Sequence, residues 1–245
     1  MLTIVPPEEL GTAEHGWLSA KHHFSFADYT DPDRMGLGPL RVWNDDLIRA
    51  GGGFPMHPHR DMEIMTYVRT GAVSHEDSLG NKGRTVAGDV QVMSAGTGIT
   101  HAEYNLEDTD TTLFQIWVHP DKRGHGPRWE TRKFPVAERE ARLSVLASGR
   151  KEDHETGALP IHQDAALIAA TLKPEQQVVH NLREGRAAYL VPAYGALLVN
   201  GIEVPERAGV TVLEERALTI EPISDAEVVI VDVPYPWSPR SIING

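Results

Sequence analysis

Two short strings in the first half of the chain place potential metal ligands at alternate positions. They are His57-Pro58-His59 and His101-Ala102-Glu103. Alternate residues of an extended strand point to the same face, so each string would aim two ligand side chains in one direction. On neighbouring strands they would bring three imidazoles and one carboxylate together, a donor set that suits a first-row divalent metal with open coordination positions. We therefore expect a metalloenzyme rather than a purely structural domain.

Short strands are the elements that must position these ligands. The chain of 245 residues contains 22 glycines and 17 prolines, which divide it into short apolar segments. Because no long amphipathic helix interrupts these segments, the pattern predicts an all-β fold of the sandwich or barrel type. A charged run at 135–142 is expected to be a linker or short helix, and a polar run at 148–157 a loop. Strands are predicted at 62–68, 112–118, 187–191, 196–200, 210–213 and 228–233.

The composition limits the kinds of chemistry and partner open to this chain. Its net charge of −12 argues against direct nucleic-acid binding, because phosphate contacts need basic patches. It has no cysteine, which excludes disulfides, thiolate metal ligands and cysteine nucleophiles. The first residues lack the pattern of a signal peptide, and no run of about 18 apolar residues occurs. We therefore expect a cytoplasmic protein with no membrane segment.

Both ligand strings lie within longer motifs. The segment from Gly51 through His57, His59 and Glu63 to Gly71 resembles the first motif of the cupin superfamily, although the interval between the glutamate and the last glycine is one residue longer than usual. The segment 88–105 resembles the second motif, with Ser94 where proline is usual and a longer interval before the histidine. Glu63 and Glu103 are alternative fourth ligands here. Glu63 stands four residues after His59, so an unbroken strand would turn it to the same face.

The departures from the cupin pattern are those of one subgroup, the pirin family. The chain resembles this family over nearly its whole length. The resemblance is carried by the segments 22–46, 53–105, 113–120, 161–172 and 197–201. It implies a bicupin, with two jelly-roll β-barrels in one chain: residues 1–134 as the metal-binding N-terminal barrel and 135–245 as a C-terminal barrel without metal. It also implies that the metal ligands are His57, His59, His101 and Glu103. Glu63 then becomes a residue that supports the ligands.

The same resemblance implies an activity. Several pirin-like proteins act on quercetin as 2,3-dioxygenases, so the expected substrates are a flavonol, or a related enol or aromatic compound, and dioxygen. The flavonol would bind through its 3-hydroxyl group, and Glu103 would be the catalytic residue that accepts the proton. The enolate would then react with dioxygen, and the central ring would open with loss of carbon monoxide. Iron is the first choice of metal, although N and O ligands also accept Zn, Mn, Ni, Co or Cu.

A second hypothesis is a regulatory protein that binds a protein partner without turnover and responds to its metal or redox state. Some pirins bind transcription factors or metabolic enzymes, and an iron site without thiolates can still change between ferrous and ferric. A pull-down with oxidised and reduced protein would distinguish this hypothesis from catalysis. A metal-assisted isomerase or hydrolase would use the same ligands. We expect a monomer, since no feature of the sequence announces an interface.

Other residues could line a substrate pocket or have only structural roles. Phe54 and Met56 are candidates for the wall of an aromatic-substrate pocket, with Met65, Met93, Phe114 and Trp117 divided between pocket and core. Arg60 would hold an anionic substrate or pair with a neighbouring acid. Histidines without a ligand pattern are interpreted as structural: His154, His162, His180 and the pair at 22–23, which we expect to hydrogen-bond the backbone of a loop. His75 to Ser78 is interpreted as a hairpin turn stabilised by Asp77 and Ser78.

Overall fold

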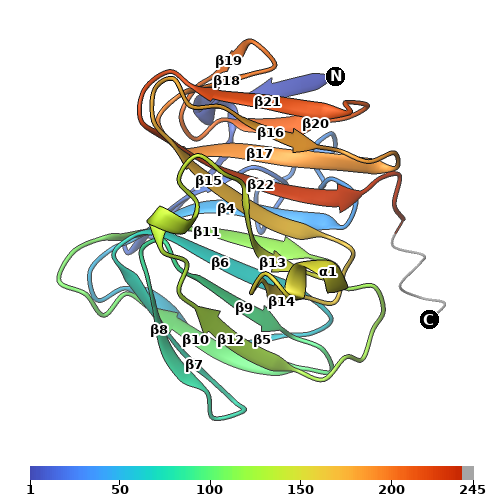
Figure 1. Ribbon diagram of the computed structural model, residues 1–245. Coiled ribbons are helices and arrows are strands. Elements are labelled where there is room, and N and C mark those ends of the chain that lie inside the picture. The colour runs from blue at the N-terminus through green and yellow to red at the C-terminus, as the bar shows by residue number, and fades with distance from the viewer. Residues whose placement is uncertain (239–245) are drawn as a thin grey trace.

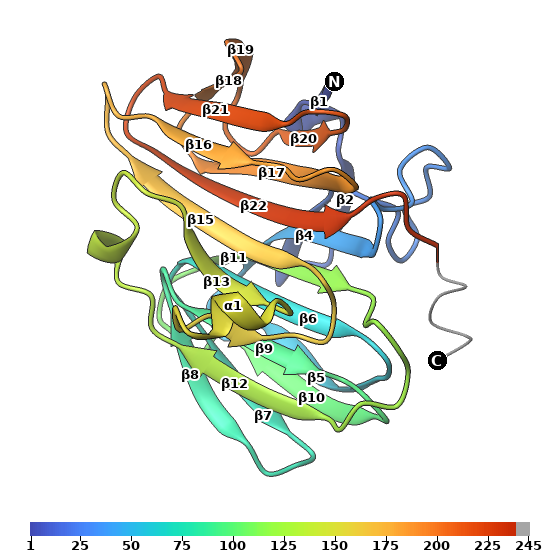
Figure 2. The same ribbon diagram turned by 45° about the vertical axis from the view of Figure 1, so that its right-hand side comes forward.

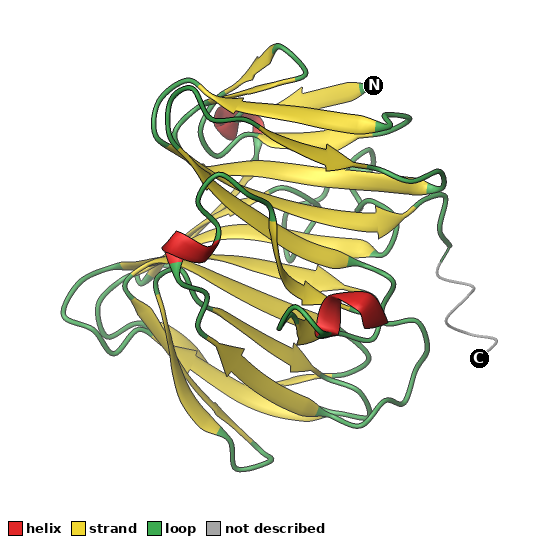
Figure 3. Cartoon of the chain, in the orientation of Figure 1, coloured by secondary structure: helices red, strands yellow, loops and turns green. Residues whose placement is uncertain are grey.

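The computed structural model describes residues 1–238 and is built almost entirely from β-strands (Figures 1 and 3). Its helical segments are one α-helix of four residues, α1 (Lys151–His154), and two 3-10 turns, η1 (Pro7–Glu9) and η2 (Val136–Glu138). The all-β prediction is therefore confirmed. The segment expected as a linker or short helix contains η2, whereas the expected loop at 148–157 contains the turn of α1. None of these helical segments has the length and apolar character needed to span a membrane.

The N-terminal unit consists of two antiparallel sheets that form a jelly-roll sandwich. The larger sheet has seven strands, in the order β12 (Arg128–Arg132), β9 (Val90–Ser94), β6 (Glu63–Thr70), β11 (Thr111–Val118), β4 (Leu40–Ile48), β3 (Leu18–His22) and β2 (Gly11–Glu14). The smaller sheet has four strands, in the order β5 (Gly53–His59), β10 (Ile99–Tyr104), β7 (Ala72–Asp77) and β8 (Lys82–Val86). The predicted ligands therefore lie on adjacent strands of the small sheet.

The C-terminal unit repeats this arrangement. Its larger sheet has the order β1 (Leu2–Val5), β20 (Gly209–Val212), β17 (Arg186–Tyr194), β22 (Ala226–Pro234), β15 (Ala166–Leu172), β13 (Ser144–Ser148) and β14 (Leu159–Pro160). Its smaller sheet has the order β16 (Val178–Asn181), β21 (Ala217–Pro222), β18 (Leu197–Val199) and β19 (Ile202–Val204). Strand β1 pairs with β20, so the first strand of the chain extends the C-terminal sheet. The boundary between residues 134 and 135 remains a prediction.

The two large sheets pack against each other in the middle of the molecule, as both ribbon views show (Figures 1 and 2). One hydrophobic cluster joins them, with Trp43 and Phe114 from the N-terminal unit and Tyr189 and Val229 from the C-terminal unit. The rings of Trp43 and Tyr189 have centroids 5.5 Å apart. Ion pairs from Asp45 to Arg69 and Arg207 lie at the edge of this interface. The two units are therefore held together by a shared core.

The interiors of the two sandwiches differ in polarity. Aliphatic side chains such as Ile168, Leu190 and Ile230 form a buried cluster inside the C-terminal unit. On β4 and β11 of the N-terminal unit, alternate residues face opposite ways, so that Trp43, Phe114 and Ile116 enter the shared core. The residues between them that line a cavity are polar or aromatic: Asn44, Asp46, Gln115 and Trp117. The N-terminal unit therefore has a buried polar interior, beside the predicted ligands.

Candidate metal centre

Three of the four predicted ligands form a cluster on the inner face of the small N-terminal sheet. Nitrogen atoms of His57, His59 and His101 all lie within 4.8 Å of one another. The ring centroid of His57 is 4.7 Å from that of His59 and 4.5 Å from that of His101. The register explains this, because His101 on β10 lies directly opposite His57 on β5, and Ile99 lies opposite His59. The sequence prediction that these imidazoles converge is therefore consistent with the fold.

A β-bulge in β5 adjusts which side chains face inward. The register pairs His101 with His57 but Glu103 with Phe54, so Pro55 and Met56 together lie opposite Ala102. The extra residue lets Phe54 and His57 face the same side, although their spacing in sequence is odd. β5 is an edge strand, which is where prolines are tolerated. The bulge thus places an aromatic side chain beside the imidazoles.

The imidazoles are arranged as neutral metal ligands. The carbonyl of Pro55 lies 2.7 Å from Nδ1 of His57, and a carbonyl only accepts, so Nδ1 carries the proton and Nε2 is free to bind. That Nε2 lies 3.1 Å from Nε2 of His101. Two nitrogens bound to one ion at right angles, each at about 2.1 Å, would be about 3 Å apart. Burial and the neighbouring imidazoles lower the pKa of His59 to about 4 and that of His101 to about 3. The residues therefore fit a divalent metal.

Glu103 lies beside this cluster and is held by hydrogen bonds. Oε2 accepts a bond of 2.6 Å from Nε2 of Gln115, and Oε1 accepts bonds from Nε2 of Gln91 and, at 3.4 Å, from the hydroxyl of Thr66. A carboxylate oxygen of Glu103 lies within 4.8 Å of nitrogens of His101 and His75, but it does not belong to the three-histidine group. The side chain is therefore oriented by amide donors at one edge of the cluster.

A cavity of about 170 Å³ opens beside the imidazoles and Glu103. Its apolar wall consists of Phe26, Phe54, Ile64 and Trp117. Its polar wall contains two buried acceptor atoms that find no hydrogen-bond partner among residues 1–238, Oδ1 of Asp46 and Oε1 of Gln115. Burial, followed by the charges of Asp45 and Glu103, raises the pKa of Asp46 well above its ordinary value. The cavity therefore offers aromatic surfaces together with unsatisfied polar atoms.

Of the residues predicted to line a substrate pocket, some lie at the cavity and others do not. Phe54 lines the cavity, as expected, and its ring meets Trp17 edge-on at 4.9 Å. Met56 does not: as the direct neighbour of His57 it faces the opposite side of the strand, where it is 51% exposed. Met65, Met93 and Phe114 are core residues.

Arg60 and Glu63 are also placed away from the cavity. Arg60 lies on a separate surface hollow beyond His59, and within the described residues it forms neither of the expected ion pairs with Asp61 or Glu63. Glu63 is bonded to Ser94 at 2.7 Å and to His162 at 3.2 Å, and neither of these partners is a predicted ligand. The strand alternation that would turn Glu63 to the same face as His59 is broken, because β5 ends at His59 and Asp61, in the turn before β6, has a positive φ of 47°.

The sequence interpretation missed His75. The turn after β7 is confirmed, since Oδ1 of Asp77 accepts bonds from the backbone of Leu79 and Asn81. Ser78 instead accepts a bond from Thr100 on another strand. His75 and Asp77 are buried on the same face as the cluster, and Nδ1 of His75 lies 3.4 Å from Nδ1 of His101. The alternate spacing of these two residues was the available signal, the same one that marked His57 and His59.

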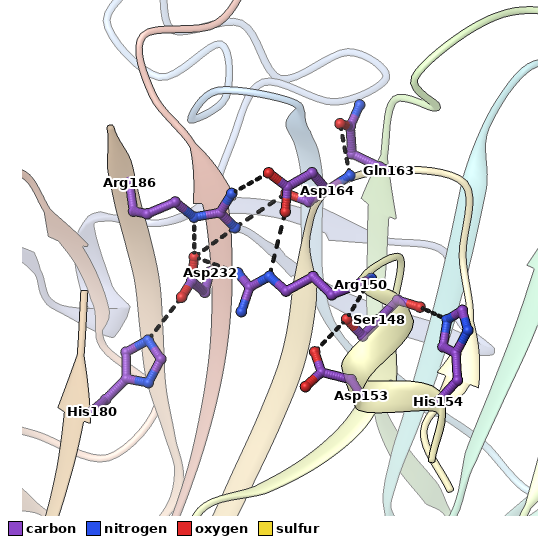
Figure 4. A network of polar contacts seen from close by, with 9 residues as sticks. All are labelled: Ser148, Arg150, Asp153, His154, Gln163, Asp164, His180, Arg186 and Asp232. Atoms are coloured by element: carbon purple, nitrogen blue, oxygen red, sulfur yellow. Dashed lines mark hydrogen bonds and ion pairs between the residues drawn. The ribbon is translucent and has the colours of Figure 1, made fainter. Parts of the chain in front are cut away.

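The C-terminal unit carries an ion-pair network of its own (Figure 4). Asp232 accepts bonds from Nε2 of His180 at 3.0 Å, from Arg186 at 2.7 Å and from Arg150 at 2.9 Å, while Asp164 pairs with both arginines. His154 bonds the carbonyl of Ser148 at 2.9 Å. In residues 1–238, both groups of three potential metal ligands lie in the N-terminal unit.

The pair at 22–23 bonds side chains rather than loop backbone. His22 ends β3, and its Nδ1 lies 2.8 Å from Oδ1 of Asn44. Nδ1 of His23 lies 3.0 Å from the hydroxyl of Tyr189 in the other unit. Both are buried, and His23 therefore links the two units.

Known proteins are similar to this chain over almost its full length. A family model described as Pirin matches residues 6–118, and one described as Quercetinase C-terminal cupin domain matches residues 145–233. A Pseudomonas aeruginosa protein that is provisionally named a quercetin 2,3-dioxygenase is 59% identical over 93% of this chain and 97% of its own length. The quercetin 2,3-dioxygenase of Escherichia coli K12 is 43% identical over 96% of this chain and 99% of its own. The crystal structure of the bacterial pirin YhhW from Escherichia coli, in complex with nickel(II), superposes with a TM-score of 0.89 at 42% identity, covering 96% and 99% of the two chains.

Proposed function

Because this chain belongs to the pirin family, we propose that it is a metal-dependent dioxygenase that cleaves quercetin-like flavonols, or related enols and phenols, with dioxygen. The observation that carries the proposal is the three-imidazole cluster beside Glu103 in a buried, partly aromatic cavity. Fold alone does not define an activity, so the argument rests on this site and on the names of close relatives.

We propose His57, His59, His101 and Glu103 as the metal ligands. The relative YhhW has been crystallised with nickel(II), which supports a divalent ion at this kind of centre. Iron remains our first choice for the active form, as the pirin family implies. When bound, the ion would lower the pKa of a substrate hydroxyl and supply the redox chemistry toward dioxygen.

Glu103 is the proposed proton acceptor. Three donors, the amides of Gln91 and Gln115 and the hydroxyl of Thr66, contact its oxygens. These donors fix the direction of the carboxylate beside the cavity, where it can take the proton of a substrate enol. The aromatic wall would exclude water from the same space.

Cavity size and polarity support a hydroxylated ring as the part of the substrate that enters. A volume of about 170 Å³ is smaller than the roughly 300 Å³ at which pockets for whole drug-sized ligands begin. We therefore expect the cavity to enclose one part of a flavonol and leave the remainder outside. A phenolic hydroxyl in this part would donate to Oδ1 of Asp46 or Oε1 of Gln115, which have no partner otherwise.

Oxygen uptake with quercetin tests the proposal directly. The protein, purified without chelator or nickel resin, is analysed for its metal and then reloaded separately with Fe²⁺, Mn²⁺, Co²⁺ and Ni²⁺. We expect one ion per chain and loss of quercetin absorbance with matching oxygen uptake. Glu103→Gln should lower the rate by about 100-fold or more, the usual contribution of a general base.

Glu76→Gln is the matched control. Glu76 is exposed on the outer face of β7 and pairs only with Lys82, at 3.1 Å, among the described residues. This variant should retain the wild-type rate. The proposal fails if no loaded form consumes oxygen with quercetin, or if Glu103→Gln and Glu76→Gln are equally active.

A further inference from the structure

A continuous path of side-chain contacts runs from Asp77 through His75 to His101. Oδ2 of Asp77 lies 3.0 Å from Nε2 of His75. Nδ1 of His75 lies 3.4 Å from Nδ1 of His101, whose Nε2 is in turn 3.1 Å from Nε2 of His57. The three residues of the path are at most 4% exposed. The path therefore ends at the proposed metal position and is shielded from water.

The sheet register brings these side chains together. On the β7–β10 pair, Asp77 lies opposite His101, and His75 lies opposite Glu103. All four side chains project from the same face, since they occupy alternate positions on adjacent strands. Trp129 on β12 stacks flat on the His75 ring, with centroids 4.6 Å apart and planes 8° apart. The plane of the His75 ring is therefore restrained by stacking.

The partners of Asp77 determine the direction of each hydrogen bond. Its Oδ1 accepts from the backbone N–H groups of Leu79 and Asn81, and both oxygens receive the side-chain amide of Asn81. With this many donors the carboxyl group acts as an acceptor, so Nε2 of His75 donates to it. A neutral His75 then presents Nδ1 as an acceptor. Nδ1–H of His101 donates to it, which leaves the lone pair of His101 on Nε2, toward His57.

We propose that Asp77 and His75 are positioning residues that select the metal-binding tautomer of His101. Asp77 accepts from Nε2 of His75, which leaves Nδ1 of His75 to accept from Nδ1–H of His101. This inference rests on the metal centre of the proposed function, but not on its substrate. In this arrangement Nδ1 of His75 accepts the Nδ1 proton of His101, as the carbonyl of Pro55 accepts that of His57. Partners of this kind are typically worth about 10- to 100-fold in metal affinity.

The substitution Asp77→Asn tests the direction of these hydrogen bonds, because asparagine has nearly the same shape as aspartate but carries a donor group. The two backbone N–H groups that face Oδ1 of Asp77 would hold the carbonyl oxygen of the new amide on that side. Its NH₂ group would then face His75 and donate, which places the proton of His75 on Nδ1 and opposes Nδ1–H of His101. We expect the affinity for Ni²⁺, measured by competition titration with a chelator, to fall by about 10- to 100-fold. Glu76→Gln should leave it unchanged.

A second measurement, of the tautomer of His101, needs no metal. Long-range ¹H–¹⁵N NMR on the metal-free wild-type protein reports which nitrogen of each imidazole carries the proton. We expect His101 to be protonated on Nδ1 in the wild type and to shift toward Nε2 in Asp77→Asn. His75→Phe keeps a ring against Trp129 but removes both hydrogen bonds, and it should also lower the Ni²⁺ affinity.

The outcomes separate the two proposals. The inference is overturned if wild-type His101 carries its proton on Nε2, or if Asp77→Asn binds Ni²⁺ as tightly as Glu76→Gln. If the wild type binds no metal at all, the proposed function fails, while the NMR result still decides the role of Asp77 and His75. An Asp77→Asn protein that does not fold leaves the wild-type tautomer and His75→Phe as the deciding measurements.

Discussion

Nδ1 of His162, in the C-terminal unit, lies 3.2 Å from Oε1 of Glu63 in the N-terminal unit. The His162 ring also stacks on that of His125, with centroids 3.9 Å apart, and His125 bonds Asp121 at 2.6 Å. Glu63 is buried and also accepts a bond from Ser94. A titratable side chain thus links the two units close to the start of β6.

This link predicts a pH-dependent contribution to stability. The hydrogen bond to Glu63 outweighs burial and raises the pKa of His162 above its ordinary 6.5, with Arg128 opposing and Asp121 assisting. A raised folded-state pKa means that the contribution is complete below pH 6.5 and is lost as the pH rises through the folded pKa. We expect the wild type to exceed His162→Gln in free energy of unfolding by more at pH 5.5 than at pH 8. Urea titrations at the two pH values measure this difference, and a constant gap would contradict it.

Asp46 predicts a second pH effect, in the same direction. Its folded-state pKa is raised, mainly by burial, so the wild type loses stability as the pH rises from 3.8 through that pKa. Asparagine resembles the protonated form and does not titrate. In metal-free protein, Asp46→Asn should therefore be more stable relative to the wild type at pH 7.5 than at pH 4.5. The free energy of unfolding of the variant minus that of the wild type should be larger at the higher pH. The exposed control Asp108→Asn should show no such change between the two pH values.

Gly83 lies under the ring that restrains His75. A Cβ atom built there would lie 2.2 Å from Cη2 of Trp129, so Gly83→Ala must displace the indole. Overpacking of this type costs about 1–3 kcal/mol, and we expect the Ni²⁺ affinity to fall several-fold because the stacking on His75 is disturbed. Gly126→Ala is the control, since nothing lies within 4 Å of its added Cβ. Thermal unfolding and Ni²⁺ titration of both variants would show whether the two effects occur together.

The arginine network of the C-terminal unit is expected to be structural. Asp232 is 3% exposed and neutralises Arg150 and Arg186, whereas the side chain of Asp164 is 63% exposed. Removing the buried carboxylate leaves Arg150 and Arg186 paired with the exposed Asp164 instead, so Asp232→Asn should lower the free energy of unfolding by on the order of 3 kcal/mol. Asp164→Asn should cost less than about 1 kcal/mol, because exposed ion pairs contribute little. Equal losses from the two variants in urea unfolding would show that burial does not govern this network.

Local pattern was enough to predict the fold class and the convergence of the imidazoles. Strand alternation is a property of the backbone, so His57 and His59, like His101 and Glu103, share a face wherever their strands are placed. Glycine and proline spacing predicted short strands, and the resemblance to the pirin family supplied the number of units. The absence of a comparable pattern in the second half agrees with an interior made mainly of aliphatic side chains.

Tertiary structure decided everything that depends on which strands are neighbours and on where a strand is interrupted. The bulge opposite Ala102 turned Phe54 inward, and the positive φ of Asp61 separated Glu63 from the ligands. Pairing of β7 with β10 brought His75 and Asp77 behind His101, and β1 joined the sheet of the opposite unit. The reason is physical: alternation fixes the direction of a side chain relative to its own strand, but register, bulges and packing depend on long-range contacts that a local pattern does not encode.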